Sequence, residues 1–231
     1  MTESLLVVTQ AAPYRDGPAG VHAVLDQAAT AFGQLADRNG LRARRVEDVR
    51  ALEDDALYRA RALVLFTIGE TPWNRVQRAE IGARLRTGEL SVMAVHSATD
   101  SSYGWDDHGR IVGARFDGHP WTQTVTADVL EPHHPATAHL GDAWTWHDEV
   151  YQFRDLRPDA RVLLRVRDDD LDASAPGARR PEFGYPLAWC HNEGSGRVFS
   201  SSLGHFPAAW ESTVFLRHLD GGLAWVLGTG E

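Results

Sequence analysis

Cysteine is almost absent from this chain, because Cys190 is the only one among its 231 residues. A single thiol excludes an intrachain disulfide and a CxxC metal site. Its position within a late, strand-like run favours a small buried apolar side chain over a nucleophile. The chemistry of this protein therefore has to come from other side chains.

Basic runs and long apolar runs are also missing. The formal net charge is -9, so binding to nucleic acid through phosphate neutralisation is not expected. No apolar stretch approaches the length of a membrane span, and residues 1–4 lack the basic region of a signal peptide. We therefore expect a cytoplasmic protein that contacts neither nucleic acid nor a membrane, and the composition leaves open whether it forms a homo-oligomer.

What the first hundred residues do contain is an alternation of strand and helix patterns. Continuous apolar runs predict buried strands at 5–8, 62–67 and 91–96, with a further strand at 41–46. Apolar spacing predicts a helix over 21–35, and shorter signals predict a helical turn at 54–59. Another helix is expected from Thr71-Pro72, interpreted as the N-cap and the first helical position, to about Arg86. This order predicts an α/β fold with a mostly parallel sheet and helices on both faces.

The second half is less regular. Strands are expected at 122–130 and 160–166, and a hairpin at 186–191 and 196–202 is indicated by the turn signal at 192–195. Residues 168–184 are typical of an exposed loop. A final helix is expected over 210–227, although Gly221-Gly222 weakens its middle. No linker divides the chain, so we expect one domain over residues 1–231.

The chain has 11 histidines, and several follow glycine or end an apolar strand. Imidazole titrates near neutral pH and binds metals and polar ligands, and open α/β sheets bind ligands beyond the carboxyl ends of their strands. His96 ends the fourth predicted strand, so it is a candidate general base, metal ligand or ligand donor. The alternative is a buried structural ring whose nitrogens form hydrogen bonds with backbone groups. Asp100, four residues on, either orients His96, binds a ligand hydroxyl or caps a turn.

Two acidic neighbours, Asp148 and Glu149, face opposite ways if they lie on a strand. We favour Glu149 in the site, because Tyr151 would share its face; a solvated acidic pair is the alternative. Among the other histidines, His119 and His205 each follow a glycine that can aim the ring inward. The alternative for each is a structural hydrogen bond that pins a loop.

A metal site is neither predicted nor excluded by these residues. Zinc, nickel and iron sites combine imidazoles with carboxylates. The available donors are His96, His119, His134, Glu149 and His205. No HExxH or comparable short spacing is present, so no cofactor is certain and a bound divalent metal stays open.

Several motifs together resemble the ThuA-like family, named for trehalose utilisation. They are Val95-His96, Ala98-Thr99-Asp100, Gly113-Ala114-Arg115-Phe116, Gly118-His119-Pro120, His134-Pro135-Ala136-Thr137, Asp148-Glu149-Val150-Tyr151, Pro186-Leu187-Ala188-Trp189-Cys190, Gly196-Arg197-Val198-Phe199 and Leu203-Gly204-His205. The resemblance implies a modified flavodoxin-like, doubly wound fold related to the class I glutamine amidotransferases, with extra β-strands in the C-terminal half. The sequence departs from the family pattern at Asp16, which follows Arg15 where a histidine is usual.

The same resemblance implies a role in the catabolism of trehalose or a related disaccharide or keto-sugar. His96 stands where the related amidotransferases carry their cysteine nucleophile, so glutamine hydrolysis through a thioester is not expected. We expect acid/base chemistry on a small carbohydrate by His96, Glu149 and Asp100, as in a keto-sugar lyase, isomerase or hydrolase. Substrate contacts are expected from Arg15, Trp105, His119, His134, Tyr151 and His205. The alternatives are a non-catalytic sugar-binding or regulatory module on the same fold, and a metal-dependent hydrolase.

Overall fold

A mixed nine-stranded sheet organises the chain in a computed structural model that describes residues 4–18 and 22–230. The strand order is β2-β1-β3-β4-β11-β10-β9-β6-β7. The bounds are β1 Ser4–Ala11, β2 Arg42–Val46, β3 Ala60–Ile68, β4 Ser91–Val95, β6 Trp121–Val129, β7 Ala143–Val150, β9 Arg161–Val166, β10 Pro186–Glu193 and β11 Gly196–Ser201. A separate two-stranded ribbon pairs β5 (Arg115–Phe116) with β8 (Phe153–Arg154). The α/β fold with extra strands in the C-terminal half is confirmed.

The sheet is parallel in one half and antiparallel in the other. Strands β2, β1, β3 and β4 run parallel, and β11 continues this half by pairing parallel with β4. The hairpin partner β10 then runs antiparallel to β11, and β9, β6 and β7 continue in antiparallel order. Because parallel strands end at the same edge, the segments after β1, β3, β4 and β11 meet there.

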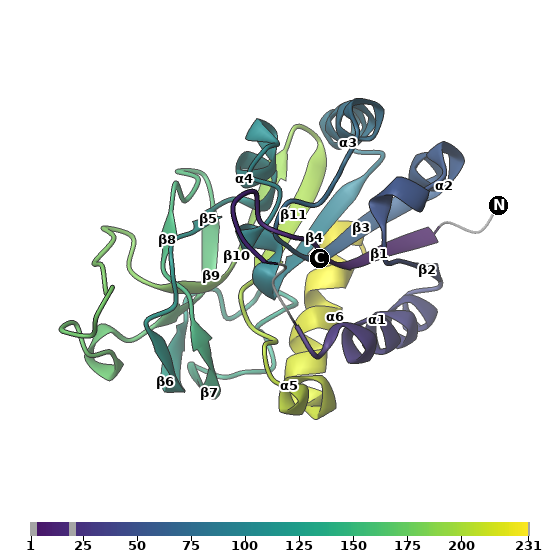
Figure 1. The fold of residues 1–231 in the computed structure, drawn as a ribbon. Coiled ribbons are helices and arrows are strands. Elements are labelled where there is room, and N and C mark those ends of the chain that lie inside the picture. Colours follow the sequence, from purple (N-terminus) through teal and green to yellow (C-terminus); the bar gives the residue numbers. More distant parts are fainter. Residues whose placement is uncertain (1–3, 19–21, 231) are drawn as a thin grey trace.

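Helices cover both faces of the parallel half (Figure 1). On one face lie α1 (Leu25–Arg38), α5 (Pro207–Glu211) and α6 (Thr213–Leu227), and on the other lie α2 (Asp54–Arg59), α3 (Arg75–Thr87) and α4 (Asp106–Val112). Each face has its own apolar core. Phe32, Phe66 and Phe215 are fully buried in the first, and Leu63, Ile81 and Leu85 are buried in the second. The alternation of strand and helix thus positions one polar edge between two packed layers.

Two sequence expectations about helix ends need correction. Helix α3 begins at Arg75 rather than after Thr71, because Asn74 is the N-cap and forms a capping box with Gln77. The final helical region is two helices, since Ser212 caps a new start by accepting from the Phe215 N–H. Val21, expected in the first helix, lies outside the described residues.

Gly221-Gly222 does not interrupt α6; both glycines lie within it. No helix in the described ranges is both long and apolar enough to cross a membrane.

Candidate functional site

His96 occupies the turn that follows β4, and its backbone is unusual. Its φ is +48°, in the left-handed region that non-glycine residues rarely adopt, whereas Val95 before it is extended. Such strain persists only where surrounding contacts over-determine it, and it clusters at functional sites. The His96 ring is fully buried, and its Nδ1 lies 2.8 Å from the carbonyl of Ser202, after β11. Since a carbonyl only accepts, Nδ1 carries the proton and Nε2 presents its lone pair to the Tyr151 hydroxyl, 3.1 Å away.

Glu149 lies at the centre of the imidazole cluster. Its Oε2 is 3.2 Å from His205 Nδ1 and 3.6 Å from His96 Nε2, and its Oε1 is 3.7 Å from His119 Nδ1. His96 Nε2 is in turn 3.3 Å from His205 Nδ1 and 3.1 Å from the Tyr151 hydroxyl. Five predicted site residues, from four separate segments, therefore meet, each with a polar atom within 4 Å of another member.

These neighbours drive the ionisation of the cluster in different directions. Burial lowers the pKa of His96 to about 4, so its imidazole is neutral at pH 7. Burial alone would raise the pKa of Glu149, but the hydrogen bond from His205 and the attraction of His119 and His205 lower it to about 2. The hydrogen bond to Glu149 raises the pKa of His205 above its ordinary value. A carboxylate and two imidazoles with separated pKa values are the arrangement that acid/base chemistry uses.

His22, which sequence analysis did not single out, also belongs to this cluster. Its ring centroid is 4.7 Å from that of His96 and 5.4 Å from that of His205. Burial, followed by repulsion from His96 and His205, lowers the pKa of His22 to about 3. His22 precedes α1 in an irregular segment, where no periodicity indicates which way a side chain faces.

Asp148 holds the backbone beside the cluster through hydrogen bonds. Its carboxylate accepts from the backbone N–H of Gly204 at 2.8 Å and of His205 at 3.2 Å, and from the Trp146 indole at 3.1 Å. Burial raises the pKa of Asp148, while these hydrogen bonds oppose that rise. Asp148 thus fixes the backbone that presents His205, and its neighbour Glu149 contacts the imidazole itself.

Asp100 is held by two tyrosines rather than by His96. The hydroxyls of Tyr14 and Tyr103 each donate to its carboxylate at 2.5 Å, and burial raises its pKa. Both tyrosines line a cavity of about 440 Å³, with Arg15, Asp16, Gly17 and Glu70. This volume falls within the range of small-molecule sites. Asp100 ends the 3-10 helix that His96 begins, and its carboxyl group interacts electrostatically with His119 and Glu149, so Asp100 and its two tyrosines connect the cavity to the imidazole cluster.

Two predicted substrate contacts lie outside this arrangement. Trp105 is buried in the apolar core, with its ring against Trp73 and His108. His134 is also buried; its Nδ1 accepts from the Ala136 N–H, and its ring packs on Phe199 and Trp225. The structure does not bring either side chain to the cluster or to the cavity beside Asp100.

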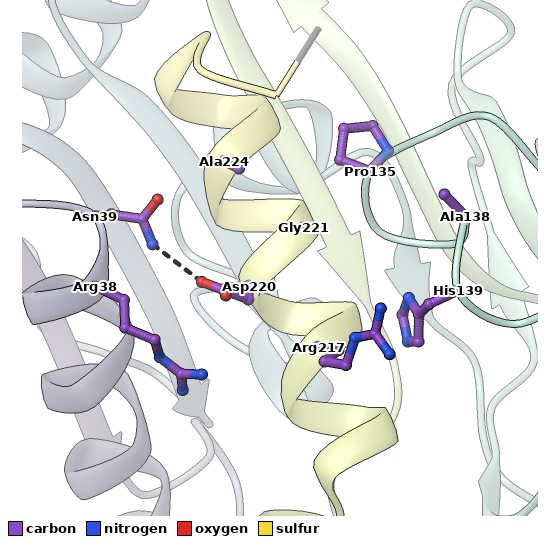
Figure 2. Close-up of a pocket in the computed structure, with 9 residues that line it drawn as sticks. All are labelled: Arg38, Asn39, Pro135, Ala138, His139, Arg217, Asp220, Gly221 and Ala224. Atoms are coloured by element: carbon purple, nitrogen blue, oxygen red, sulfur yellow. Dashed lines mark hydrogen bonds between the residues drawn. The ribbon is translucent and has the colours of Figure 1, made fainter.

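A further cavity, of about 370 Å³, lies between the end of α1, the 135–139 loop and α6 (Figure 2). Asn39 donates to Asp220 across it at 3.0 Å, and Arg38, His139 and Arg217 stand around its rim. Its nine lining residues include none of the predicted site residues. The acid/base groups therefore converge at the strand ends and not in this cavity.

Comparison with known proteins identifies the family and the fold. The sequence model of the family described as ThuA, trehalose utilisation, matches residues 13–226. A solved protein described as ThuA-like from Bacteroides uniformis shares the fold with a TM-score of 0.75 and 18% identity, over 97% of this chain and 91% of its own. Another from Parabacteroides merdae has a TM-score of 0.75 and 17% identity, over 98% and 90%.

The same fold is found in a solved protein of lower structural similarity. A solved protein from Thermoplasma acidophilum, described as part of a GMP synthase, has a TM-score of 0.52 and 10% identity, over 97% of this chain and 96% of its own. No curated protein sequence matches the chain. At such low sequence identities, the solved structures show a shared fold and nothing about activity.

Proposed function

Because this chain belongs to the ThuA (trehalose utilisation) family, we propose that it acts in carbohydrate catabolism, by acid/base chemistry on a keto-sugar derived from trehalose or a related disaccharide. The single observation that carries the proposal is the ionised Glu149 carboxylate, set among His96, His119 and His205 beside a ligand-sized cavity. A keto-sugar has a carbonyl, and the hydrogen on the adjacent carbon is the one that a positioned base can remove.

The proposed role of each group in the site follows from its ionisation state. Glu149, with its pKa near 2, is fully ionised and accepts the proton from the carbon next to the carbonyl. The electrons of the broken C–H bond move onto the carbonyl oxygen, where His205, whose pKa Glu149 raises, stabilises the oxyanion as a donor. Return of a proton to carbon, or departure of a neighbouring glycosidic oxygen, completes isomerisation or elimination.

The cavity beside Asp100 is the proposed place for the sugar. Tyr14 and Tyr103 offer ring surfaces, while Arg15 and Glu70 offer a hydrogen-bond donor and an acceptor for hydroxyl groups. Asp100, held by both tyrosines, fixes their orientation and lies four residues after His96. This arrangement supports a polar, uncharged, ring-shaped substrate.

The test is exchange of the carbon-bound proton. The protein is incubated in D₂O with trehalose and, separately, with its monoketone, and the signal of the proton next to the carbonyl is followed by NMR. We expect exchange only with the ketone, and Glu149→Gln to slow it by at least about a hundredfold. Glu211→Gln, at an exposed position on α5, is the matched control and should exchange at the wild-type rate.

An unchanged rate in Glu149→Gln would overturn the assignment of the base. Calorimetric binding of the ketone with neither exchange nor product would instead favour a sugar-binding module on the same fold.

A further inference from the structure

Three imidazoles from distant parts of the chain converge in the site. His22 precedes α1, His96 follows β4 and His205 follows β11. One ring nitrogen from each lies within 4.8 Å of one from each of the others. Metal-binding groups brought together from separate segments by the fold are typical of a preorganised metal site, because the ligands need no reorganisation when the ion binds.

Within the described part of the chain, His22 has no hydrogen bond that explains its position, although its ring also contacts Phe66. Both its ring nitrogens are shielded from solvent, and neither has a hydrogen-bond partner among residues 4–18 and 22–230. A buried polar group without a partner is unfavourable, and each such group calls for an explanation. The ring stands edge-on to those of His96 and His205. A bound cation would satisfy the lone pair that the protein leaves unpaired.

The spacing of the other two nitrogens fits an ion. In a tetrahedral zinc site with Zn–N bonds of about 2.0–2.1 Å, neighbouring ligand atoms lie roughly 3.3 Å apart. His96 Nε2 and His205 Nδ1 are 3.3 Å apart. His96 also has the outer contact that metal-bound histidines have, since its Nδ1–H donates to the Ser202 carbonyl and turns Nε2 toward the cluster.

The surroundings supply a compensating charge and a rigid backbone. The Glu149 carboxylate lies within 3.6 Å of both nitrogens, so its negative charge favours a cation beside it. Asp148 accepts from the N–H groups of Gly204 and His205 and so holds the third ligand in place. Imidazole ligands with a neighbouring carboxylate suit zinc and similar divalent transition metals rather than calcium or magnesium.

We propose that His22, His96 and His205 bind one divalent transition metal ion, of which Zn²⁺ is the representative. Three protein ligands leave a coordination position open, as in catalytic rather than structural zinc sites. The ion's role in the reaction rests on the proposed function: it would polarise the carbonyl oxygen of the sugar while Glu149 removes the proton. Binding of the ion does not rest on that function.

Co²⁺ provides the test, because its visible absorption reports the coordination number. Protein expressed without an affinity tag is stripped with a chelator and titrated with Co²⁺, and Zn²⁺ is measured by calorimetric competition. We expect one tightly bound ion per chain, with the intense absorption of four-coordinate Co²⁺. His22→Gln should weaken binding by more than about tenfold, since loss of even an outer contact of a metal ligand costs that much.

His147→Gln is the matched control, because His147 is an exposed histidine on β7 that lies outside the three-imidazole cluster. It should bind Co²⁺ as the wild type does. Far-ultraviolet circular dichroism establishes that His22→Gln is folded; if it is not, His205→Gln takes its place. A wild-type protein with no four-coordinate spectrum, or equal affinity in the wild type and His22→Gln, would overturn the site.

Different experimental outcomes would overturn the metal site and the proposed function. Tight binding of Co²⁺ without proton exchange in the ketone would support the metal site and overturn the proposed function. Proton exchange at the wild-type rate in stripped protein that binds no Co²⁺ would support the proposed function and overturn the metal site.

Discussion

At the scale of single residues, Asp148 shows how a buried charge can organise a site without touching the substrate. Its carboxylate accepts from two consecutive backbone N–H groups, of Gly204 and His205, and from the Trp146 indole. Three N–H donors aimed at one carboxyl group favour its ionised form, which has only acceptors. An amide at this position would turn an N–H toward other N–H groups.

Asp148→Asn should therefore lower the free energy of unfolding by about 1–3 kcal/mol, the cost of leaving buried donors unpaired. Urea denaturation at pH 7 measures this loss. Asp128→Asn is the control, since the Asp128–Arg167 pair is half-exposed, and we expect a loss below about 1 kcal/mol there. Equal losses in the two variants would mean that Asp148 is no more than another ion-pairing residue.

The sequence could indicate some of these residues but not how they meet. His96, Glu149 and Tyr151 could be proposed from strand ends and strand alternation, which are local patterns. His22 could not, because it lies in an irregular segment and the two histidines that it meets, His96 and His205, are more than 70 residues away in sequence. His134 shows the reverse case: its motif is clear, yet its Nδ1 accepts from the nearby Ala136 N–H and its ring packs on Phe199 and Trp225. Sequence proximity to a motif does not say toward which layer of the fold a ring points.

At the scale of elements, α6 depends on a glycine that helix propensity alone disfavours. A Cβ on Gly222 would lie 2.6–2.8 Å from ring carbons of Phe199 on β11, so the glycine permits the helix to approach the sheet. Gly33 in α1 is different, because a Cβ there would meet nothing within 4 Å. A comparison of the two positions distinguishes the effect of close packing from that of intrinsic helix propensity.

Gly222→Ala should lower the melting temperature, because overpacking of this kind costs about 1–3 kcal/mol and exceeds the gain in propensity. Gly33→Ala should raise the melting temperature, because alanine there adds up to about 1 kcal/mol to the free energy of unfolding. Thermal unfolding followed by circular dichroism compares the two. Shifts of the same sign in both variants would contradict the packing role of Gly222.

Local patterns also explain which elements could be predicted. Strands β1, β3 and β4 are continuous apolar runs, so periodicity suffices to find them. Helix α4 has only seven residues and contains Gly109, which is too short a segment for a helical pattern to emerge. The parallel pairing of β11 with β4 joins residues about 100 positions apart, and it decides where His205 lies relative to His96. Such long-range pairing is set by packing and leaves no local signal.

At the scale of the whole molecule, several imidazoles are built in as neutral groups. His108, His191 and His218 are buried, and each has a ring nitrogen within 3.0 Å of a backbone carbonyl, of Ala98, Ile111 and Ala136 respectively. Burial lowers the pKa of each to about 4, from an ordinary value of 6.5. Between these two pH values the three imidazoles are protonated in the unfolded chain but neutral in the folded chain.

The sign of the resulting pH dependence follows directly. Where the unfolded state binds more protons, stability rises with pH, so the stability present above pH 6.5 is lost as the pH falls toward 4. His22, His96 and His134, with pKa values lowered to about 3, 4 and 3, act in the same direction. His205 opposes them, because its raised pKa makes its contribution present at low pH and lost as pH rises. The carboxyls of Asp48 and Asp159, with pKa values of about 2, act only at pH values below their ordinary pKa of 3.8.

Urea unfolding in the presence of a chelator, at pH 7.5, 6.5, 5.5 and 4.5, tests this balance. We expect a modest loss in the free energy of unfolding between the first two values and a steeper loss below them. The slope approaches about 1.4 kcal/mol per pH unit for each neutral histidine not offset by His205. His108→Gln should reduce the slope between pH 5.5 and 4.5 by about that amount, whatever it does to stability at pH 7.5. A slope that is flat, or unchanged in this variant, would mean that the buried rings accept protons in the folded state, and the fold would then have to open around them.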